Sequence, residues 1–412
     1  MPTAVFAGAL LDPMSGETLR DAVVLSDGGR ILATGSRERV QVPADAERID
    51  GSGLTLLPGL IDAHVHLTSR GDGLDLGEQL GTAPSLTLLN CVQACRRTLE
   101  AGFTTVRDAG GTPAGVRMAV ERGFFPGPRM LLAVSVLSQT GGHADHLFPC
   151  GARVGFGAEG FVPESVVDGV EPMRRRVREL IQAGADWIKL CTSGGVLSHG
   201  DAPHHANFTV EEIRAAVEEG AAQGRKVMAH AQATAGIKNA LEGGVSTIEH
   251  GIWLDHEAVE LMLAGSRSLV PTLAAPAWVI RHAEHGRMPE WAAEKGREII
   301  KDHNASVSLA IESGVTVAFG TDTGVGPHGS NGEELLLLNA LGMAPLDCIR
   351  AATTVAARVI GLEGSAGTLA EGALCDLVGI AGDPLADLTL LARPENVALV
   401  VKDGRVAKAR AA

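Results

Sequence analysis

The sequence lacks the features that mark membrane, secreted and nucleic-acid-binding proteins. No apolar run approaches the roughly 18 residues that a membrane helix needs. The N-terminus, "MPTAVFAGALLDP", has neither the basic start nor the sustained apolar run of a signal peptide. The formal net charge is −14, so phosphate backbones and anionic lipid surfaces would be repelled. We expect a cytoplasmic protein without nucleic-acid or membrane partners, and a processed secreted form stays open.

The cysteines form no CxxC pair, the motif of zinc ribbons and dithiol redox enzymes. Cys91 and Cys95 are spaced to share a helix face, but a free cysteine is most often a small core residue. We expect buried free thiols, as in a protein from a reducing compartment, at Cys91, Cys95, Cys150, Cys191, Cys348 and Cys375.

Length and hydropathy pattern predict two unequal structural units. The chain has 412 residues, of which 45% are hydrophobic, enough for one large core and a smaller satellite domain. Residues 1–56 and 363–412 consist of short, glycine-punctuated, strand-like segments such as "TAVFAGALLD" and "VALVVKDGRVAKA". We expect these two ends to form one small β-sandwich domain, and residues 57–362 to form the catalytic domain.

Residues 57–362 alternate short apolar or β-branched runs with amphipathic helices. Eight runs are candidate strands, from "LLPGLIDAH" at 56–64 through "DWIKLC" at 186–191 to "VTVAFGTD" at 315–322. Thr209 is a candidate N-cap for the helix "TVEEIRAAVEEGAAQG". Eight strand–helix repeats predict an α/β fold, the (β/α)8 TIM barrel. A doubly wound open sheet is the alternative, and the missing GxGxxG after the first strand weighs against it.

Chemically active side chains fall at the ends of several predicted strands. The carboxyl ends of barrel strands meet at one site, so these side chains are expected to converge. Taken singly, each histidine has a simpler explanation as an ordinary polar residue. Lys189 is unusual, because an unpaired ammonium in a buried strand costs several kcal/mol. Together the strand ends predict one site formed by His64, His66, Lys189, His230, His250 and Asp322.

This set of side chains favours a pair of metal ions. Imidazole and carboxylate ligands suit zinc and similar divalent ions, and the set is too large for one open tetrahedral site. A buried lysine is easily neutral, and a neutral amine reacts with carbon dioxide to give a carbamate that can bridge two ions. Such ions lower the pKa of a shared water and polarise a carbonyl. Asp322 would take the proton of that water and return it to the leaving nitrogen.

Five motifs resemble those of a known family: "PGLIDAHVH", "IKLCTSGG", "AHA", "IEHG" and "GTD", in this order. They resemble the binuclear metal-dependent amidohydrolase superfamily, as does the C-terminal "GTLAEGALCDLV", in which "CDLV" replaces the usual Ala-Asp step. The resemblance implies two metal ions, most often zinc, a carbamylated Lys189 and a catalytic Asp322. It also implies that the ligands are His64, His66, Lys189, His230, His250 and Asp322.

Two further segments, "SQTGGHADH" and "SGGVLSHGD", resemble the imidazolonepropionase-related peptidase branch. Its members include prolidases, other dipeptide or N-acyl-amino-acid carboxypeptidases, and enzymes that cleave the amide of ochratoxin. His143 is similar in position to a histidine that helps bind the scissile carbonyl oxygen in relatives, a donor role that is worth several kcal/mol. The alternative is a loop histidine held by turn backbone. The resemblance also suggests a homo-oligomer, an octamer in many members.

The chain departs from this branch in having no tyrosine at all. Many of these peptidases hold the substrate carboxylate with a tyrosine two residues after the strand-five histidine, where this chain has Gln232. Carboxylate recognition must therefore be rebuilt, or the substrate class differs. We favour Gln232, and the other candidates, each more simply loop surface, are Arg107, His199, His204, His205 and His328.

The sequence thus predicts a dinuclear metal hydrolase that cleaves a small-molecule amide beside a C-terminal amino acid, using Asp322, His143 and Gln232. The alternative keeps the same site for cyclic amides, lactones or organophosphate esters. A non-enzymatic scaffold would be expected to have lost some of the ligands, and all six are present. The segment "VIRHAEHGRMPEW" at 279–291 is expected to be a long loop over the site or the start of a solvated helix.

Overall fold

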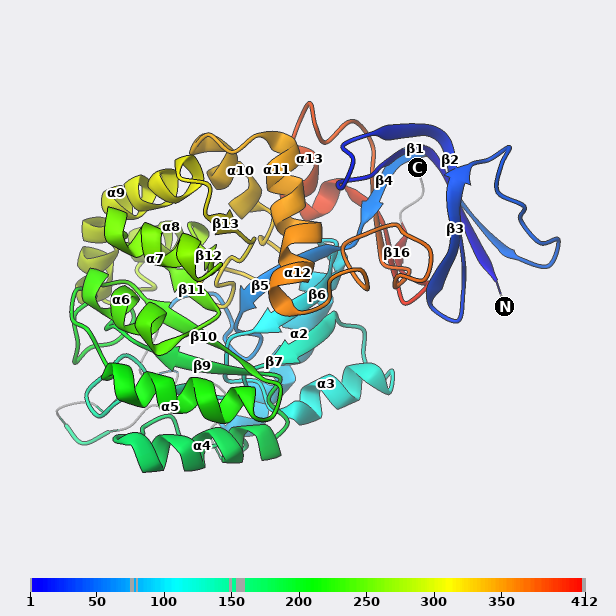
Figure 1. The fold of residues 1–412 in the computed structure, drawn as a ribbon. Helices are drawn as coiled ribbons and strands as arrows, with labels where there is room; N and C mark the ends of the chain where they lie inside the picture. Colours follow the sequence, from blue (N-terminus) through cyan, green and yellow to red (C-terminus); the bar gives the residue numbers. More distant parts are fainter. Residues whose placement is uncertain (1, 75–77, 79–80, 148–149, 153–159, 410–412) are drawn as a thin grey trace.

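The computed structural model describes residues 2–74, 78, 81–147, 150–152 and 160–409. Figure 1 shows parallel strands surrounded by helices in a large body, and a smaller β unit beside it that holds both ends of the chain. The expected α/β barrel fold with a satellite β unit built from both termini is confirmed.

The barrel strands coincide with the eight predicted runs. They are all parallel, and seven of their neighbour pairs form ladders, of which the one between β5 and β6 has shifts in register. Most of their residues are buried on both faces, as expected of a sheet covered by helices. The strands are β5 (Leu60–Val65), β6 (Phe103–Asp108), β7 (Arg129–Leu132), β8 (Val136–Leu137), β9 (Trp187–Cys191), β10 (Lys226–Ala231), β11 (Thr247–His250), β12 (Ser268–Val270) and β13 (Thr316–Val317).

The third run is broken into β7 and β8, which the sequence did not predict. Val134 lies between them with φ +66°, a conformation that β-branched residues rarely adopt. β7 pairs with β6, whereas β8 pairs with β9, so the bend carries the chain from one neighbour to the other.

Hydrogen bonds after β13 close the ring of strands. The Ala63 N–H donates to Phe319 O, and the His66 N–H donates to Thr323 O. The Asp322 N–H donates in return to His64 O at 2.8 Å. These bonds place Asp322 directly beside the end of β5.

Helices cover the outside of the barrel, and Thr209 caps α5 as predicted, in a capping box with Glu212. The segment 279–291 is mostly helical, because it contains the end of α8 and the start of α9. The helices are α2 (Pro84–Glu100), α3 (Ala114–Glu121), α4 (Val170–Gln182), α5 (Val210–Ala221), α6 (Thr234–Gly243), α7 (His256–Ala264), α8 (Ala274–Glu284), α9 (Glu290–Glu312), α10 (Glu333–Ala340), α11 (Pro345–Arg350), the π-helix Ala351–Val355, α12 (Ala356–Ile360), α13 (Thr389–Ala392) and the 3-10 turn Pro394–Asn396.

The satellite unit is a seven-stranded mixed sheet in the order β16-β15-β14-β4-β1-β2-β3. β4 pairs in parallel with β1 and antiparallel with β14, which joins the two ends of the chain. β4 runs to Pro58 and leads directly into β5, while the predicted division at residues 56 and 363 stays a prediction. The strands are β1 (Thr3–Leu11), β2 (Thr18–Asp27), β3 (Arg30–Ser36), β4 (Glu47–Pro58), β14 (Leu377–Ile380), β15 (Val397–Lys402) and β16 (Arg405–Ala409).

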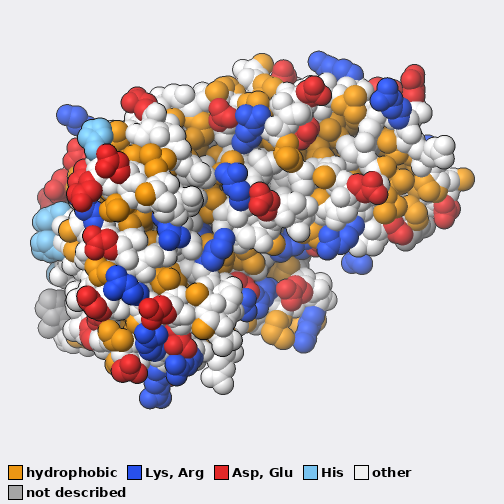
Figure 2. Space-filling view, in the orientation of Figure 1, with side chains coloured by type: hydrophobic (Ala, Val, Ile, Leu, Met, Phe, Trp, Pro, Cys, Tyr) orange, Lys and Arg blue, Asp and Glu red, His pale blue; other side chains and the backbone are white. Residues whose placement is uncertain are grey.

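The cysteines are free thiols, five of them buried as expected, but Cys150 is exposed. Among the described residues, no helix is both long and apolar enough to span a lipid bilayer. On the face drawn in Figure 2, acidic and basic side chains are interspersed rather than gathered by sign.

Candidate active site

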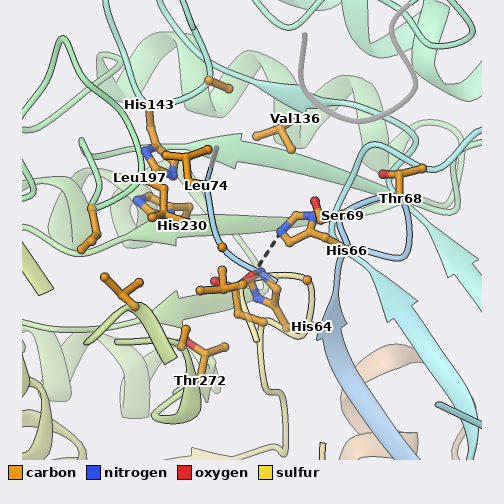
Figure 3. A pocket seen from close by; sticks show the side chains of 18 of the residues that line it. His64, His66, Thr68, Ser69, Leu74, Val136, His143, Leu197, His230 and Thr272 are labelled. Atoms are coloured by element: carbon orange, nitrogen blue, oxygen red, sulfur yellow. Dashed lines mark ion pairs between the residues drawn. The ribbon is translucent and has the colours of Figure 1, made fainter. Parts of the chain in front are cut away.

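The six predicted ligands lie together at the carboxyl ends of the barrel strands. β5 carries His64 and leads to His66, β9 carries Lys189, β10 carries His230 and β11 ends at His250. Figure 3 shows His64, His66 and His230 pointing into one space, with His143 lying over His230. Ring centroids lie 5.5 Å apart for His64 and His66 and 4.5 Å apart for His230 and His250, and the 5.2 Å between His64 and His250 joins the two pairs into one cluster.

The two histidines of the β5 end each have one nitrogen fixed by an acceptor. Nδ1 of His64 lies 2.7 Å from Oε2 of Glu249, and Nδ1 of His66 lies 2.9 Å from Gly110 O. A carboxylate and a carbonyl only accept, so each Nδ1 carries the hydrogen. In the neutral rings the lone pair is therefore on Nε2, the nitrogen that faces Asp322 in both cases.

The other two histidines are fixed in the same way. Nε2 of His230 donates to Gly194 O at 3.0 Å, which leaves its Nδ1 with the lone pair. Nδ1 of His250 lies 2.6 Å from Oγ1 of Thr272, whose own hydroxyl donates to Pro271 O. His250 therefore donates from Nδ1 and keeps a lone pair on Nε2. Metal-binding histidines are typically oriented by such hydrogen bonds from the second nitrogen.

Asp322 supplies a carboxylate at the centre of this cluster. Its Oδ1 lies 3.3 Å from Nε2 of His66 and 3.6 Å from Nε2 of His64, and this buried oxygen accepts no hydrogen bond from the described residues. Burial would raise the pKa of Asp322, but the neighbouring His64 and His66 outweigh it and lower that pKa. A carboxylate oxygen that lacks a hydrogen bond within the described part of the chain and faces two imidazole nitrogens is an arrangement that a cation would complete.

A metal ion fits this donor set. Ligand atoms of His64, His250 and Asp322 lie within 4.8 Å of one another. Lys189 is also buried, with Nζ 3.4 Å from Nε2 of His64, and burial lowers the pKa of its ammonium. The site thus combines nitrogen and oxygen ligands of the type that zinc prefers with an amine that is easily neutral.

His143 reaches the same space from the segment after β8. Its ring stacks on His230, with centroids 4.2 Å apart and an interplanar angle of 18°. Its Nδ1 lies 2.8 Å from Oγ of Ser198, in the segment after β9. Burial lowers the pKa of His143 to about 4.

A cavity of about 460 Å³ joins the ligand cluster to the surface. His143 and Gln232 line it, as do all six predicted ligands. Its other walls are partly apolar, which suits an organic group, and they also contain the charged residues Arg70, Asp72 and Glu78. The larger apolar side chains among the lining residues are Leu74, Val136, Val196, Leu197, Ile252, Val279, Met288, Ile299 and Val325.

The structure separates the residues considered for carboxylate recognition. Gln232 lines the cavity, and its buried Oε1 has no hydrogen-bond partner within the described part of the chain. Arg107 is fully buried behind the site and donates to Ala63 O and Glu249, so it is not available to a substrate carboxylate. The loop histidines do not line the cavity either: His199, His204 and His205 are exposed, and His328 is buried against Ser69 O.

The sequence analysis missed two buried residues of this site. Glu249 accepts from His64 and pairs with Arg107 at 2.9 Å, and His303 of α9 lines the cavity and donates to His250 O at 3.0 Å. Glu249 could have been found from the sequence, because Arg107 and Glu249 are opposite charges within strands expected to be buried. Each buried charge needs a partner. A single histidine within a helix gives no comparable signal.

The chain is similar to known proteins along nearly its whole length. The model of the amidohydrolase family matches residues 55–407. The chain belongs to the amidohydrolase family. Ochratoxinase from Aspergillus niger is 34% identical over 424 residues, covering 98% of this chain and 86% of that relative. A prolidase solved in complex with N-methylphosphonate-L-proline shares 35% identity with a TM-score of 0.91, over 100% of both chains.

A Xaa-Pro dipeptidase with bound methionine in its active site is also similar, at 30% identity and a TM-score of 0.89, over 98% of this chain and 99% of that one. The resemblance to the peptidase branch of the amidohydrolases is thereby confirmed. The chain is a hydrolase that acts on carbon–nitrogen bonds of amide or peptide type. Amidohydrolases are metal-dependent, and the cluster of His64, His250 and Asp322 is a possible metal site.

Proposed function

We propose that this amidohydrolase cleaves the amide bond that precedes a C-terminal amino acid, as in N-acyl amino acids, Xaa-Pro and other dipeptides, or ochratoxin-type amides. The observation that carries the proposal is the convergence of four oriented imidazoles and the Asp322 carboxylate at the base of a cavity with partly apolar walls. The names of the ochratoxinase, prolidase and dipeptidase relatives support the same substrate class.

Two divalent ions, with zinc the proposed identity, would be held by His64, His66, His230, His250, Asp322 and a carbamate formed from carbon dioxide on Lys189. Bound there, they would polarise the scissile carbonyl and lower the pKa of a water molecule. The low pKa of Asp322 keeps it a carboxylate near neutral pH, so it can take the proton of the attacking water. Asp322 then returns this proton to the leaving nitrogen.

Gln232 is proposed to bind the substrate carboxylate through its side-chain amide. Arg70 also lines the cavity, but its guanidinium is already paired with Asp72 and, in bidentate fashion, with Glu78. A substrate carboxylate would have to compete with both of those carboxylates. The donor that Gln232 offers is its side-chain NH2 group, which forms no ion pair with a described acidic residue, so a substrate carboxylate would meet no such competition there. The apolar walls would then receive the acyl portion of the substrate.

The test is turnover of a defined panel by purified protein loaded with zinc. The panel contains N-acetyl and N-formyl amino acids, Xaa-Pro and other dipeptides, and an ochratoxin-type amide, with lactones and phosphotriesters as controls. We expect turnover of at least one class of carboxylate-bearing amide, and its loss after chelation and return on adding zinc. Turnover confined to lactones or phosphotriesters would overturn the proposal and favour the alternative substrates of the same site.

A further inference from the structure

A buried chain of hydrogen bonds leads from Asp201 to the ring of His143. Oγ of Ser198 donates to Oδ1 of Asp201 and lies 2.8 Å from Nδ1 of His143. The other carboxylate oxygen of Asp201 accepts from Gly195 N at 3.0 Å. The Asp201 side chain is only 4% exposed, so a nearly buried carboxylate has both oxygens engaged in this loop.

The direction of the bond at His143 follows from the hydrogens available. The Ser198 hydroxyl has a single hydrogen, and a carboxylate can only accept one. If that hydrogen points to Asp201, Nδ1 of His143 must donate to Oγ of Ser198. The other nearby acceptor, Gly195 O, lies farther from the hydroxyl at 3.3 Å and already accepts from Lys295, so the carboxylate of Asp201 is the favoured acceptor. Nδ1 therefore carries a hydrogen whether the ring is neutral or charged.

The orientation of the ring itself is set by packing. His230 stacks on His143, as Figure 3 shows. A Cβ on Gly195 would lie only 2.2 Å from Cε1 and 2.3 Å from Nδ1 of His143, so the ring lies directly against this glycine. Lys295 of α9 also anchors the loop, donating to the carbonyls of Gly195, Ser198 and Asp201 at 3.1, 2.7 and 2.7 Å, and its Nζ lies 3.6 Å from Oδ1 of Asp201.

We propose that Asp201 is a positioning residue which, through Ser198, keeps the hydrogen of His143 on Nδ1 and leaves Nε2 as the acceptor in the cavity. In this form Nε2 accepts a hydrogen bond from a substrate N–H group. Binding the scissile carbonyl oxygen, the role expected from the family resemblance, would require a second hydrogen on the ring. The identity of the substrate group that Nε2 contacts rests on the proposed function, whereas the role of Asp201 in placing the hydrogen does not.

The decisive variant is Asp201→Asn. The asparagine has one amide oxygen, which cannot accept from both Ser198 and Gly195. When this oxygen accepts from the Gly195 N–H, the amide NH2 group faces Ser198 and donates to its hydroxyl. The Ser198 hydroxyl then donates to Nδ1, which moves the ring hydrogen to Nε2. We expect ¹⁵N spectra of the histidine-labelled full chain, assigned by comparison with His143→Asn, to show Nδ1–H in the wild type and Nε2–H in Asp201→Asn. We expect kcat to fall about 100-fold, with KM changed less than about 3-fold.

Two further variants separate positioning from simple loop support. Asp168→Asn is the matched control, because Asp168 accepts from N and Oγ1 of Thr140 in the segment that carries His143 but has no bond to the ring. It should keep the wild-type spectrum and kcat. Lys295→Met loosens the loop and removes the cation beside Asp201, yet the carboxylate and the Ser198 hydroxyl both remain, so it should keep Nδ1–H. A merely structural role for Asp201 would make the spectra of these variants alike.

A wild-type ring with its hydrogen on Nε2 would overturn the proposal, as would an unchanged spectrum in Asp201→Asn. If Asp201→Asn fails to fold, Ser198→Ala tests the same series of hydrogen bonds. It removes the acceptor of the Nδ1 hydrogen, so the Nδ1–H and Nε2–H forms of His143 should both appear. A pure Nδ1–H signal in Ser198→Ala would show that the hydrogen bonds through Ser198 do not fix the hydrogen of His143. Failure of the wild type to cleave any amide would refute the proposed function, whereas the spectra would still decide the role of Asp201.

Discussion

Glu249 accepts a hydrogen bond from Nδ1 of His64 across 2.7 Å, and both side chains are buried. Burial alone would raise the pKa of Glu249, but the charge of Arg107 and the bond to His64 outweigh it and hold that pKa at about 2. Glu249 is therefore a permanent acceptor that fixes the hydrogen of His64 on Nδ1. The lone pair on Nε2 is in turn kept available to a metal ion.

Replacing Glu249 by glutamine should weaken metal binding. The single oxygen of the amide cannot serve both His64 and Arg107, so the ring of His64 loses its fixed orientation. Loss of a partner of this kind typically weakens metal affinity 10- to 100-fold. We expect a weakening of about that size, measured as the zinc retained after dialysis against a series of buffered zinc concentrations. Glu242→Gln, an exposed glutamate seven residues earlier, is the matched control. Equal zinc content in Glu249→Gln and wild type would contradict this role.

The alanine variant of Lys189 tests the proposed carbamate. Without the amine no bridging carbamate can form, and we expect activity to fall more than about 100-fold. A short carboxylic acid such as acetate or propionate should restore part of it, because the acid can occupy the vacated space with its two oxygens. Lys226→Ala, an exposed lysine at the start of β10, should retain full activity. Undiminished turnover in Lys189→Ala would refute the bridging role.

The sequence predicted the barrel strands and the ligand cluster because both depend on local patterns. Short apolar runs mark buried strands, and residues such as His230 and His250 fall where those strands end. The partners of these ligands depend instead on contacts between distant segments. Glu249 lies 142 residues from Arg107, and Ser198 lies 55 residues from His143, so neither pair has a spacing that a motif could record.

Two features of the chain path were also beyond local prediction. Val134 belongs to a residue type that favours strands, yet it adopts a left-handed conformation between β7 and β8. The bonds of Gly111 N to Val134 O and of Ala133 N to Asp108 O fix this bend by tertiary contacts. Similarly, His303 of α9 reaches the site only because the helix packs beside the turn that follows β11.

Glu334 should make the stability of the protein depend on pH. Its buried carboxyl group accepts from the N–H groups of Leu273 and Ala274, and burial raises its pKa from 4.5 to about 8. A pKa raised on folding gives stability that is fully present below the unfolded value and is lost as pH rises through the folded value. Its contribution should therefore decline between about pH 4.5 and pH 8, by at most about 1.4 kcal/mol per pH unit.

Urea unfolding of the wild type and Glu334→Gln across this pH range would measure the decline. The glutamine is neutral throughout and accepts only one of the two N–H groups, so the variant should be less stable at low pH. The difference in free energy of unfolding should then narrow as pH rises. Glu312→Gln, an exposed glutamate, serves as control and should run parallel to the wild type. A constant difference at every pH would show that Glu334 does not change its protonation on unfolding.

Gln232→Leu should separate recognition of the carboxylate from the shape of the cavity. Leucine is close in size to glutamine but has no hydrogen-bonding group. A hydrogen bond to a charged group is worth about 1.5–3 kcal/mol, so KM for a free-carboxylate substrate should rise at least about 10-fold. KM for the methyl ester of the same substrate should change little, since it has no charge to lose. Gln223→Leu, at an exposed glutamine after α5, controls for the substitution itself. If both KM values rise together, Gln232 shapes the cavity and another group binds the carboxylate.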